Sequence, residues 1–255
     1  MKDLQKKHKV VAVVPAAGLG KRFGQGTNKP FQTLCGKPLV VWSISELEKV
    51  PEIVEIIPVL KEDDMASGQK LFEEYGFSRI KKIAPGGKER QDSVYNGLRL
   101  IDDEDCMVLI HDGVRPLVEK ELIENTIKEL QSALSPSSME NKVGFKAIDG
   151  VIPVVPLKDT VKEADDGVVK RTLKRGTLWA VQTPQVFHYA SVLHAYEKAL
   201  KEGYFATDDA ALVERYGGRV KIITGSYRNI KITTPEDLEI AAFFIGKRPT
   251  VKVCG

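Results

Sequence analysis

The stretch "VVAVVPAAGLGKRFGQGTNKP", residues 10–30, decides how the rest of the sequence is interpreted. Its first five residues form an apolar run, which predicts a β-strand. The run leads into a loop that is rich in glycine and in cationic side chains. A strand that ends in a glycine-rich turn offers free backbone N–H groups to anionic oxygens. We therefore expect an α/β protein that binds a phosphate-bearing molecule at the end of its first strand.

Short apolar runs alternate with helical patterns along the remainder of the chain, which is the signature of βαβ units. The alternation predicts one α/β domain over residues 10–246, with tails at 1–9 and 247–255. Its core would be a single Rossmann-like, mostly parallel twisted sheet flanked by helices. Strands are expected at 10–14, 53–59, 80–83, 107–110, 151–155, 178–181 and 220–224, and helices near 39–48, 65–75, 91–100, 120–130, 189–202, 208–216 and 235–246.

Two segments break this alternation. Residues 133–150 are polar and rich in turn-forming residues, which predicts a loop insertion. Residues 156–176 alternate apolar and polar side chains around Asp165-Asp166-Gly167, which predicts a β-hairpin with a tight turn. Because a hairpin this polar buries little of its own surface, we expect a protruding arm that packs on a second subunit of a homodimer.

Composition excludes several classes of protein. Lys and Arg number 38 against 35 Asp and Glu, which argues against a nucleic-acid coat or a polybasic membrane surface. The longest apolar runs fall well short of the roughly 18 to 20 residues of a membrane span. The three cysteines are widely spaced and the four histidines are scattered, so a structural zinc site is not expected. These features predict a cytoplasmic protein without a nucleic-acid or membrane partner.

The glycine-rich loop fits neither of the two most common phosphate-binding patterns. Its glycines, Gly18, Gly20 and Gly24, are one residue too widely spaced for the G-x-G-x-x-G dinucleotide fingerprint. The Gly-Lys pair at 20–21 lacks both the upstream glycine and the following Ser or Thr of a Walker loop. The loop therefore belongs to a different kind of site.

Three cations, Lys21, Arg22 and Lys29, lie within nine residues of this loop. One interpretation is a solvated basic loop that merely ends a strand. The other is a triphosphate cradle, in which the cations neutralise charge on a reacting phosphorus. Phosphoryl and nucleotidyl transfer require little covalent help from the protein, so clustered cations and a metal ion would be sufficient.

Seven motifs in order carry a resemblance to a known family. The stretch "PAAGLGKRFGQGTNKPF" resembles the signature of the sugar-phosphate nucleotidyltransferases and, within them, the cytidylyltransferases of the methylerythritol phosphate pathway. The similarity runs over residues 10–245. The other motifs are "GGKERQDSVYNGL" from Gly86, "IHDGVRPL" from Ile110, "PLKDTVK" from Pro156, "AVQTPQVF" from Ala180, "ATDDAALVERYG" from Ala206 and "GSYRNIKITTPEDL" from Gly225.

The resemblance implies an activity and a set of partners. The expected reaction transfers CMP from CTP to 2-C-methyl-D-erythritol 4-phosphate and releases pyrophosphate, with Mg²⁺ or another divalent cation as cofactor. The metal ligands are not assigned by the motifs. Two alternatives share the same motifs: a cytidylyltransferase that uses ribitol 5-phosphate, and a catalytically silent nucleotide-binding regulator. Cations drawn from both ends of the chain disfavour the regulator, since binding alone would not need them.

The resemblance also implies roles for residues of the nucleotide half of the site. Arg22 and Lys29 match catalytic cations that bind the triphosphate, and Lys231 matches a third cation near the α-phosphate. The backbone cradle matches Ala16, Ala17, Gly18, Leu19 and Gly20, and the positions that read the cytosine ring match Gly87, Lys88 and Ser93.

Further residues match the family's acceptor half. Asp112 and Arg115 match positions between the nucleotide and the polyol, and Thr183 and Thr207 match further polyol contacts. Thr160 and Arg175 lie on the predicted arm, which in the family holds the neighbour's substrate phosphate.

The sequence departs from the family pattern at three places. The segment 133–150 is longer than usual, Pro30 follows the lysine where many relatives carry glutamine, and Lys88 replaces an acidic residue of some relatives. Contact between residue 88 and the cytosine is therefore safest assigned to the backbone.

Elementary chemistry supports these roles unequally. Asp112 follows a strand, at the edge where open α/β sheets bind ligands. Its neighbour His111 could be a general base, but a phosphate nucleophile with a second pKa of about 6 is already ionised, so we expect a packed histidine.

Other polar and aromatic residues have ordinary interpretations as well. Arg115 and Arg175 could be surface cations that pair with carboxylates or face solvent. Asp208 and Asp209 could bind a metal, yet Thr207-Asp208 at a helix start favours a helix cap for Asp208. Trp42 and Trp179 lie in apolar surroundings and are expected in the core.

Overall fold

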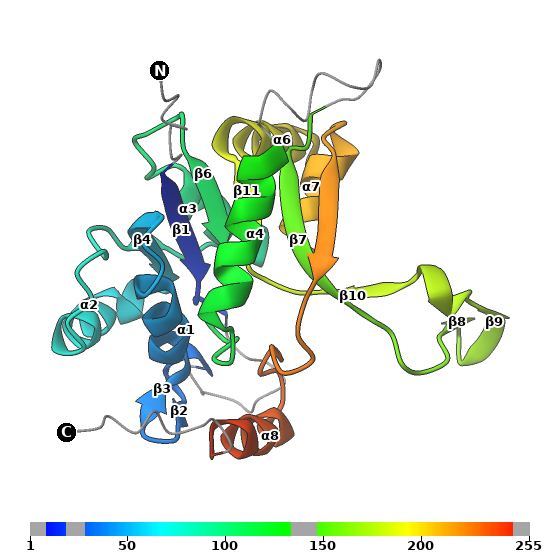
Figure 1. The fold of residues 1–255 in the computed structure, drawn as a ribbon, viewed down its shortest axis with the longest axis horizontal. Coiled ribbons are helices and arrows are strands. Elements are labelled where there is room, and N and C mark those ends of the chain that lie inside the picture. Colours follow the sequence, from blue (N-terminus) through cyan, green and yellow to red (C-terminus); the bar gives the residue numbers. More distant parts are fainter. Residues whose placement is uncertain (1–8, 19–28, 134–146, 247–255) are drawn as a thin grey trace.

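The computed structural model describes residues 9–18, 29–133 and 147–246. At its centre is an eight-stranded sheet in the order β10-β7-β11-β6-β1-β4-β5, in which β12 also pairs with β7 (Figure 1). This is the predicted α/β architecture. The strands of the sheet are β1 (Val10–Pro15), β4 (Ile53–Leu60), β5 (Ala84–Pro85), β6 (Met107–Ile110), β7 (Gly150–Pro156), β10 (Trp179–Val181), β11 (Gln185–His188) and β12 (Val220–Thr224).

The apolar run of β1 is buried because both of its faces are covered. The strand pairs in parallel with β4 and with β6. Val11 and Val13 join the core cluster beneath α3 (Arg90–Leu98), α6 (Tyr189–Glu202) and α7 (Asp209–Arg215). Val10, Ala12 and Val14 join the opposite cluster, beneath α1 (Leu39–Glu48), α2 (Met65–Glu74) and α4 (Lys120–Ala133). A strand buried on both faces needs a continuous apolar run rather than an alternating one.

Two parts of the sheet differ from the sequence prediction. Strand β11 was not predicted, and it runs antiparallel to both β6 and β7. The strand expected at 80–83 is wrong, because Ile80 makes only an isolated bridge with Ile56 and the ladder resumes at β5. Ile80 and Ile83 instead pack against the core on the α2 face. Their apolar character therefore reflects packing on the sheet edge rather than pairing within it.

Residues 156–176 form the predicted hairpin arm, which projects from the body in Figure 1. Strands β8 (Lys162–Asp165) and β9 (Val168–Thr172) pair in antiparallel fashion. Asp166 and Gly167 have φ values of 48° and 75°, which are the left-handed conformations that a two-residue turn between such strands requires. Val168 and Val169 are 69% and 55% exposed, so the arm carries apolar surface into solvent. Most of the predicted insertion, residues 134–146, lies outside the described residues.

A third and smaller core cluster joins segments that are far apart in the sequence. The short helix η1 (Lys29–Phe31) and the hairpin of β2 (Thr33–Leu34) and β3 (Lys37–Pro38) lead into α1 on one side of it. The backbone N–H of Ile232 donates to the carbonyl of Val114 at 2.9 Å, which brings in the segment before α8 (Pro235–Gly246). The buried members of the cluster are Leu34, Leu39, Val114, Leu117, Ile232 and Ala241.

The two tryptophans have different environments. Trp42 packs against this third cluster, and its Nε1 donates to the carbonyl of Leu34 at 2.8 Å, in line with the predicted core position. The prediction for Trp179 is wrong, since that side chain is 44% exposed on β10 at the base of the arm. Among the described residues, the structure contains no helix with the length and apolarity of a membrane span.

Candidate active site

A cavity of about 350 Å³ opens beyond the carboxyl end of β6. Open α/β sheets bind ligands at this edge. Five of the residues expected in the acceptor half or as catalytic cations line it: Asp112, Arg115, Thr183, Thr207 and Lys231. The remaining lining residues are Arg90, Val181, Gln182, Gln185 and Asp208.

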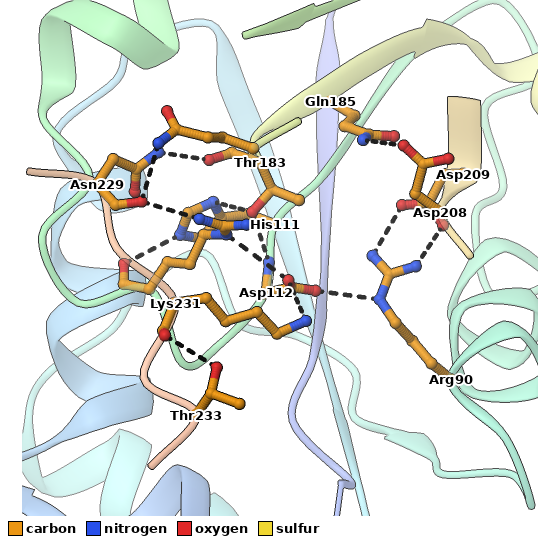
Figure 2. A network of polar contacts seen from close by, with 12 residues as sticks. Arg90, His111, Asp112, Thr183, Gln185, Asp208, Asp209, Asn229, Lys231 and Thr233 are labelled. Carbon is orange, nitrogen blue, oxygen red and sulfur yellow. Dashed lines mark hydrogen bonds and ion pairs between the residues drawn. The ribbon is translucent and has the colours of Figure 1, made fainter. Parts of the chain in front are cut away.

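The carboxylate of Asp112 is the centre of the cavity's charge network (Figure 2). Its Oδ1 accepts from Arg90 Nε at 3.1 Å, and its Oδ2 lies 2.8 Å from Lys231 Nζ and 3.7 Å from Arg115 Nε. Burial alone would raise the pKa of Asp112, but Arg90, Lys231 and Arg115 together hold that pKa well below its usual range. The carboxylate is therefore ionised at neutral pH.

His111 is packed and neutral, as expected. The imidazole is fully buried, and desolvation lowers its pKa to about 4. The backbone N–H of Asp112 donates to Thr183 Oγ1, so the Thr183 hydroxyl proton can reach His111 Nδ1 at 3.1 Å. The ring then donates from Nε2 to the carbonyl of Arg115 at 3.3 Å. His111 thus orders the Asp112 loop and is occupied on both ring nitrogens.

The segment that carries Lys231 is fixed by two residues to which the sequence analysis gave no role. The side-chain amide of Asn229 donates to the carbonyl of Thr183 at 2.8 Å, and the Asn229 carbonyl accepts from Arg115 Nη1 at 2.8 Å. Gln182 exchanges two hydrogen bonds with the backbone of Ser226. Both residues belong to motifs that were recognised, but only the fold shows that these motifs lie side by side.

Arg90 was also missed as a site residue. Its Nη1 and Nη2 each lie 2.8 Å from one carboxylate oxygen of the fully buried Asp209. Next to Asp209, Asp208 accepts from the backbone N–H of Ala211 at 3.0 Å and caps α7, which confirms the interpretation of that residue as a cap. Gln185 Nε2 donates to the second oxygen of Asp208 at 3.0 Å.

The loop after β1, which contains Gly18, approaches the turn of Gly86 and Gly87 before α3, and both belong to the predicted nucleotide half of the site. A Cβ on Gly86 would lie 2.4 Å from the Cβ of Ala17, so only glycine permits this approach. The backbone N–H of Gly87 donates to Ser93 Oγ at 3.0 Å, and that hydroxyl donates to the carbonyl of Glu89. Lys88, between Gly87 and Glu89, is exposed. Ser93 therefore stabilises the turn through hydrogen bonds to the backbone of Gly87 and Glu89.

Several predicted site residues lie elsewhere in the structure or outside its described part. Lys29 is buried in η1, at the start of the segment that enters the third core cluster. Thr160 and Arg175 are exposed, and neither lines the cavity around Asp112. Arg175 instead donates to the carbonyl of Lys158 at the base of the arm. Leu19, Gly20 and Arg22 fall outside the described residues.

The fold and the site together define a Rossmann-like nucleotide-binding enzyme, with facing glycine turns and clustered cations at the carboxyl edge of the sheet. A family model described as 2-C-methyl-D-erythritol 4-phosphate cytidylyltransferase matches residues 10–247. The chain belongs to this family. It is accordingly a CTP-dependent cytidylyltransferase, which forms 4-diphosphocytidyl-2-C-methyl-D-erythritol in isoprenoid synthesis.

Individual relatives agree with this assignment. The chain is 41% identical over 240 residues to the 2-C-methyl-D-erythritol 4-phosphate cytidylyltransferase of Geotalea uraniireducens, covering 93% of this chain and 97% of the relative. It is 43% identical over 241 residues to the enzyme of the same name from Desulforamulus reducens, covering 94% and 97%. The crystal structure of 4-diphosphocytidyl-2C-methyl-D-erythritol synthase from Anaerococcus prevotii superimposes with a TM-score of 0.79 at 31% identity, covering 97% and 100%.

Proposed function

We propose that CMP transfer takes place at the cavity around Asp112 by in-line attack of the polyol phosphate on the α-phosphorus of CTP. A phosphate oxygen forms the new bond to phosphorus as the bond to the bridging oxygen breaks, and pyrophosphate leaves. The attacking oxygen is already ionised near neutral pH, so no base is needed. The neutral and doubly hydrogen-bonded His111 is consistent with a mechanism that lacks a general base.

The observation that carries this proposal is the convergence of distant chain segments. Lys231 Nζ lies 2.8 Å from Asp112, although the two residues come from opposite halves of the sequence. The third core cluster holds the segment after Lys29 against the segments that follow Asp112 and Lys231. Preorganised cations stabilise the extra negative charge of a phosphoryl transition state without reorganising during the reaction. We assign this role to Lys29, Lys231 and Arg22.

The residues around the cavity would divide into a part that binds CTP and a part that binds the polyol phosphate. The backbone of residues 16–20 would cradle the triphosphate, and the turn of Gly87, Lys88 and Ser93 would read the cytosine ring. Asp112 is suited to accept hydrogen bonds from polyol hydroxyls, because it is ionised, lines the cavity and has Arg90 and Lys231 as hydrogen-bonding cations, with Arg115 as a more distant ion-pair partner. Arg115, Thr183 and Thr207 would complete the acceptor side.

A divalent cation, most simply Mg²⁺, fits the site as a complex with the nucleotide. No group of three or more His, Cys, Asp or Glu side chains within the described ranges could enclose a metal ion. Mg²⁺ is commonly held by one or two carboxylates together with substrate phosphates, so a protein cage is not required. When bound, the ion would neutralise charge on the phosphate oxygens.

We also propose a cytoplasmic homodimer in which the arm acts across the interface. The arm and its base expose Val168, Val169, Trp179 and Tyr227, and these large side chains are between 44% and 69% exposed. Apolar surface concentrated on a projecting element is typical of an interface. A second subunit covering it would bring Thr160 and Arg175 to the substrate phosphate of its neighbour. The catalytic unit would comprise residues 10–246.

A pyrophosphate-release assay tests the proposed reaction directly. CTP is offered with 2-C-methyl-D-erythritol 4-phosphate or with ribitol 5-phosphate, and with neither. Release with the methylerythritol compound supports the proposal, whereas release only with ribitol 5-phosphate would move the enzyme to the other acceptor. CTP binding without release in the presence of either acceptor would favour the nucleotide-binding regulator.

A further inference from the structure

Arg90 occupies a place between the two halves of the site. It is the first residue of α3 and follows the turn of Gly86 and Gly87, which faces the loop after β1. Its guanidinium bridges two carboxylates, with Nε on Asp112 and the two terminal nitrogens on Asp209 (Figure 2). The Arg90 side chain is 30% exposed, so its charge faces the cavity while its partner Asp209 is fully enclosed.

Asp209 is a rigid anchor for this guanidinium. The hydroxyl of the buried Tyr196 donates to Asp209 Oδ1, the oxygen that also accepts from Arg90 Nη1. Asp209 begins α7, whose N-cap is Asp208. A bidentate contact between arginine and a carboxylate fixes the orientation of the guanidinium group as well as its distance from the carboxylate. The orientation of Arg90 is therefore set by Asp209, and its third contact is aimed at Asp112.

The next residue of α3 provides a second tie to the same segment. Gln91 Nε2 donates to the carbonyl of Tyr204 at 2.9 Å, and Gln91 Oε1 accepts from the backbone N–H of Ala206 at 3.0 Å. These contacts fix the backbone immediately before Thr207, a residue that lines the cavity. The start of α3 thus connects the nucleotide turn, the Asp112 carboxylate and the segment that carries Thr207.

We infer that Arg90 is a positioning residue for the acceptor half of the site: anchored by Asp209, it orients the Asp112 carboxylate and balances its charge. The inference rests on the proposed function, because it takes Asp112 as a contact of the polyol phosphate. Arg90 acts through Asp112 and is not assigned a contact with the reacting atoms.

The charges around Asp112 give the inference a measurable signature. The groups that face the carboxylate are Arg90 from α3, Lys231 from the segment after β12 and Arg115 from its own loop, with the neutral His111 and the Thr183 hydroxyl beside it. Burial pushes the pKa of Asp112 upward, and Arg90 is the strongest of the cations that oppose this. Without Arg90 the pKa of Asp112 rises, so activity falls on the acidic side.

The test uses the double variant Arg90→Gln/Asp209→Asn. Removing Arg90 alone would leave Asp209 buried without its counter-ion, which can unfold a protein, whereas the double variant removes both charges together. The readout is kcat/KM for 2-C-methyl-D-erythritol 4-phosphate between pH 5 and 8, expressed as a ratio to the unmodified enzyme. Titration of the substrate phosphate affects both enzymes alike and cancels in this ratio.

We expect the ratio to fall to about one hundredth at neutral pH, since misplacement by about 1 Å has effects of this size. The loss should grow toward pH 5, and the KM for CTP should change by less than about threefold. Arg90→Lys keeps a positive charge at this position but lacks the two terminal guanidinium nitrogens that bind Asp209. Compared with the double variant, Arg90→Lys should therefore lose less additional kcat/KM between neutral pH and pH 5, while its kcat/KM at neutral pH should recover less fully.

Two further variants separate the possible explanations. Arg79→Gln is the matched control, because Arg79 is a similarly exposed arginine that pairs with Glu48 and does not line the cavity. The ratio of its kcat/KM to that of the unmodified enzyme should not change between pH 5 and 8. Asp112→Asn tests the proposed role of Asp112 itself, and full activity in that variant would refute the proposed function. If Asp112→Asn is impaired while the double variant works normally, the inference about Arg90 is overturned. It is equally overturned if the double variant loses activity evenly at every pH and Arg90→Lys restores nothing.

Discussion

Replacing Lys231 by methionine separates catalysis from stability at one position. The side chain is 41% exposed, and its ion pair with Asp112 is only partly desolvated. A pair of this kind contributes at most about 1 kcal/mol to the free energy of unfolding. Asp112 would also retain Arg90 and Arg115, so the carboxylate stays paired. The thermal midpoint of Lys231→Met should therefore lie within a few degrees of that of the unmodified enzyme.

The effect of the same change on the transition state is expected to be much larger. Removing one preorganised donor from developing oxyanion charge typically lowers turnover by about 10² to 10³, or roughly 2.7 to 4 kcal/mol. The assay is kcat for pyrophosphate release at saturating CTP and 2-C-methyl-D-erythritol 4-phosphate. Lys221→Met serves as the matched control, since Lys221 is 49% exposed and pairs with Glu129 of α4, and neither residue lines the cavity. Turnover of Lys231→Met within about threefold of normal would refute the role assigned to this lysine.

Three other predictions follow from the site and the arm. Burial lowers the pKa of His111 to about 4 in the folded protein from an ordinary value of 6.5, so between these pH values the unfolded chain binds a proton that the folded protein does not. The free energy of unfolding should therefore fall by up to about 3 kcal/mol as the pH drops from 6.5 to 4. In His111→Asn, the free energy of unfolding measured with urea should depend less on pH over this window, and an unchanged pH dependence would contradict the assignment. Arg175→Ala should raise the KM for the polyol phosphate more than the KM for CTP in steady-state assays, and equal effects on both would count against the arm's proposed role. Mixed dimers of Arg175→Ala and Lys29→Ala subunits should regain part of the activity that each lacks, whereas fully exchanged dimers without recovery would exclude a shared site.

The central strand and the arm could be predicted because local sequence determines them. The five apolar residues of β1 need cover on both faces, and the structure supplies helices on each side. Asp166 and Gly167 are residues that tolerate left-handed backbone conformations, so the hairpin turn was visible in the sequence. Short elements were less predictable: β11 has only four residues, and its sequence "QVFH" gives too little periodicity to identify a strand.

The site was only partly predictable because its supporting contacts join distant segments. Asp112 and Lys231 could be named from motifs, and the structure places their side chains 2.8 Å apart. The pairing of Arg90 with Asp209 spans 119 residues, and no pattern in a single sequence reveals it. Trp179 was misplaced for a related reason. Its neighbours are apolar, but β10 lies where the sheet meets the arm and half of the side chain stays uncovered.

The most direct test is a crystal structure with Mg²⁺ and a CTP analogue whose α,β-bridging oxygen is replaced by methylene. The proposed mechanism predicts that the ammonium groups of Lys29 and Lys231 both lie within hydrogen-bonding distance of α-phosphate oxygens, in a cavity that Asp112 also lines. A complex in which the nucleotide binds while either ammonium group faces away from the α-phosphate would contradict it.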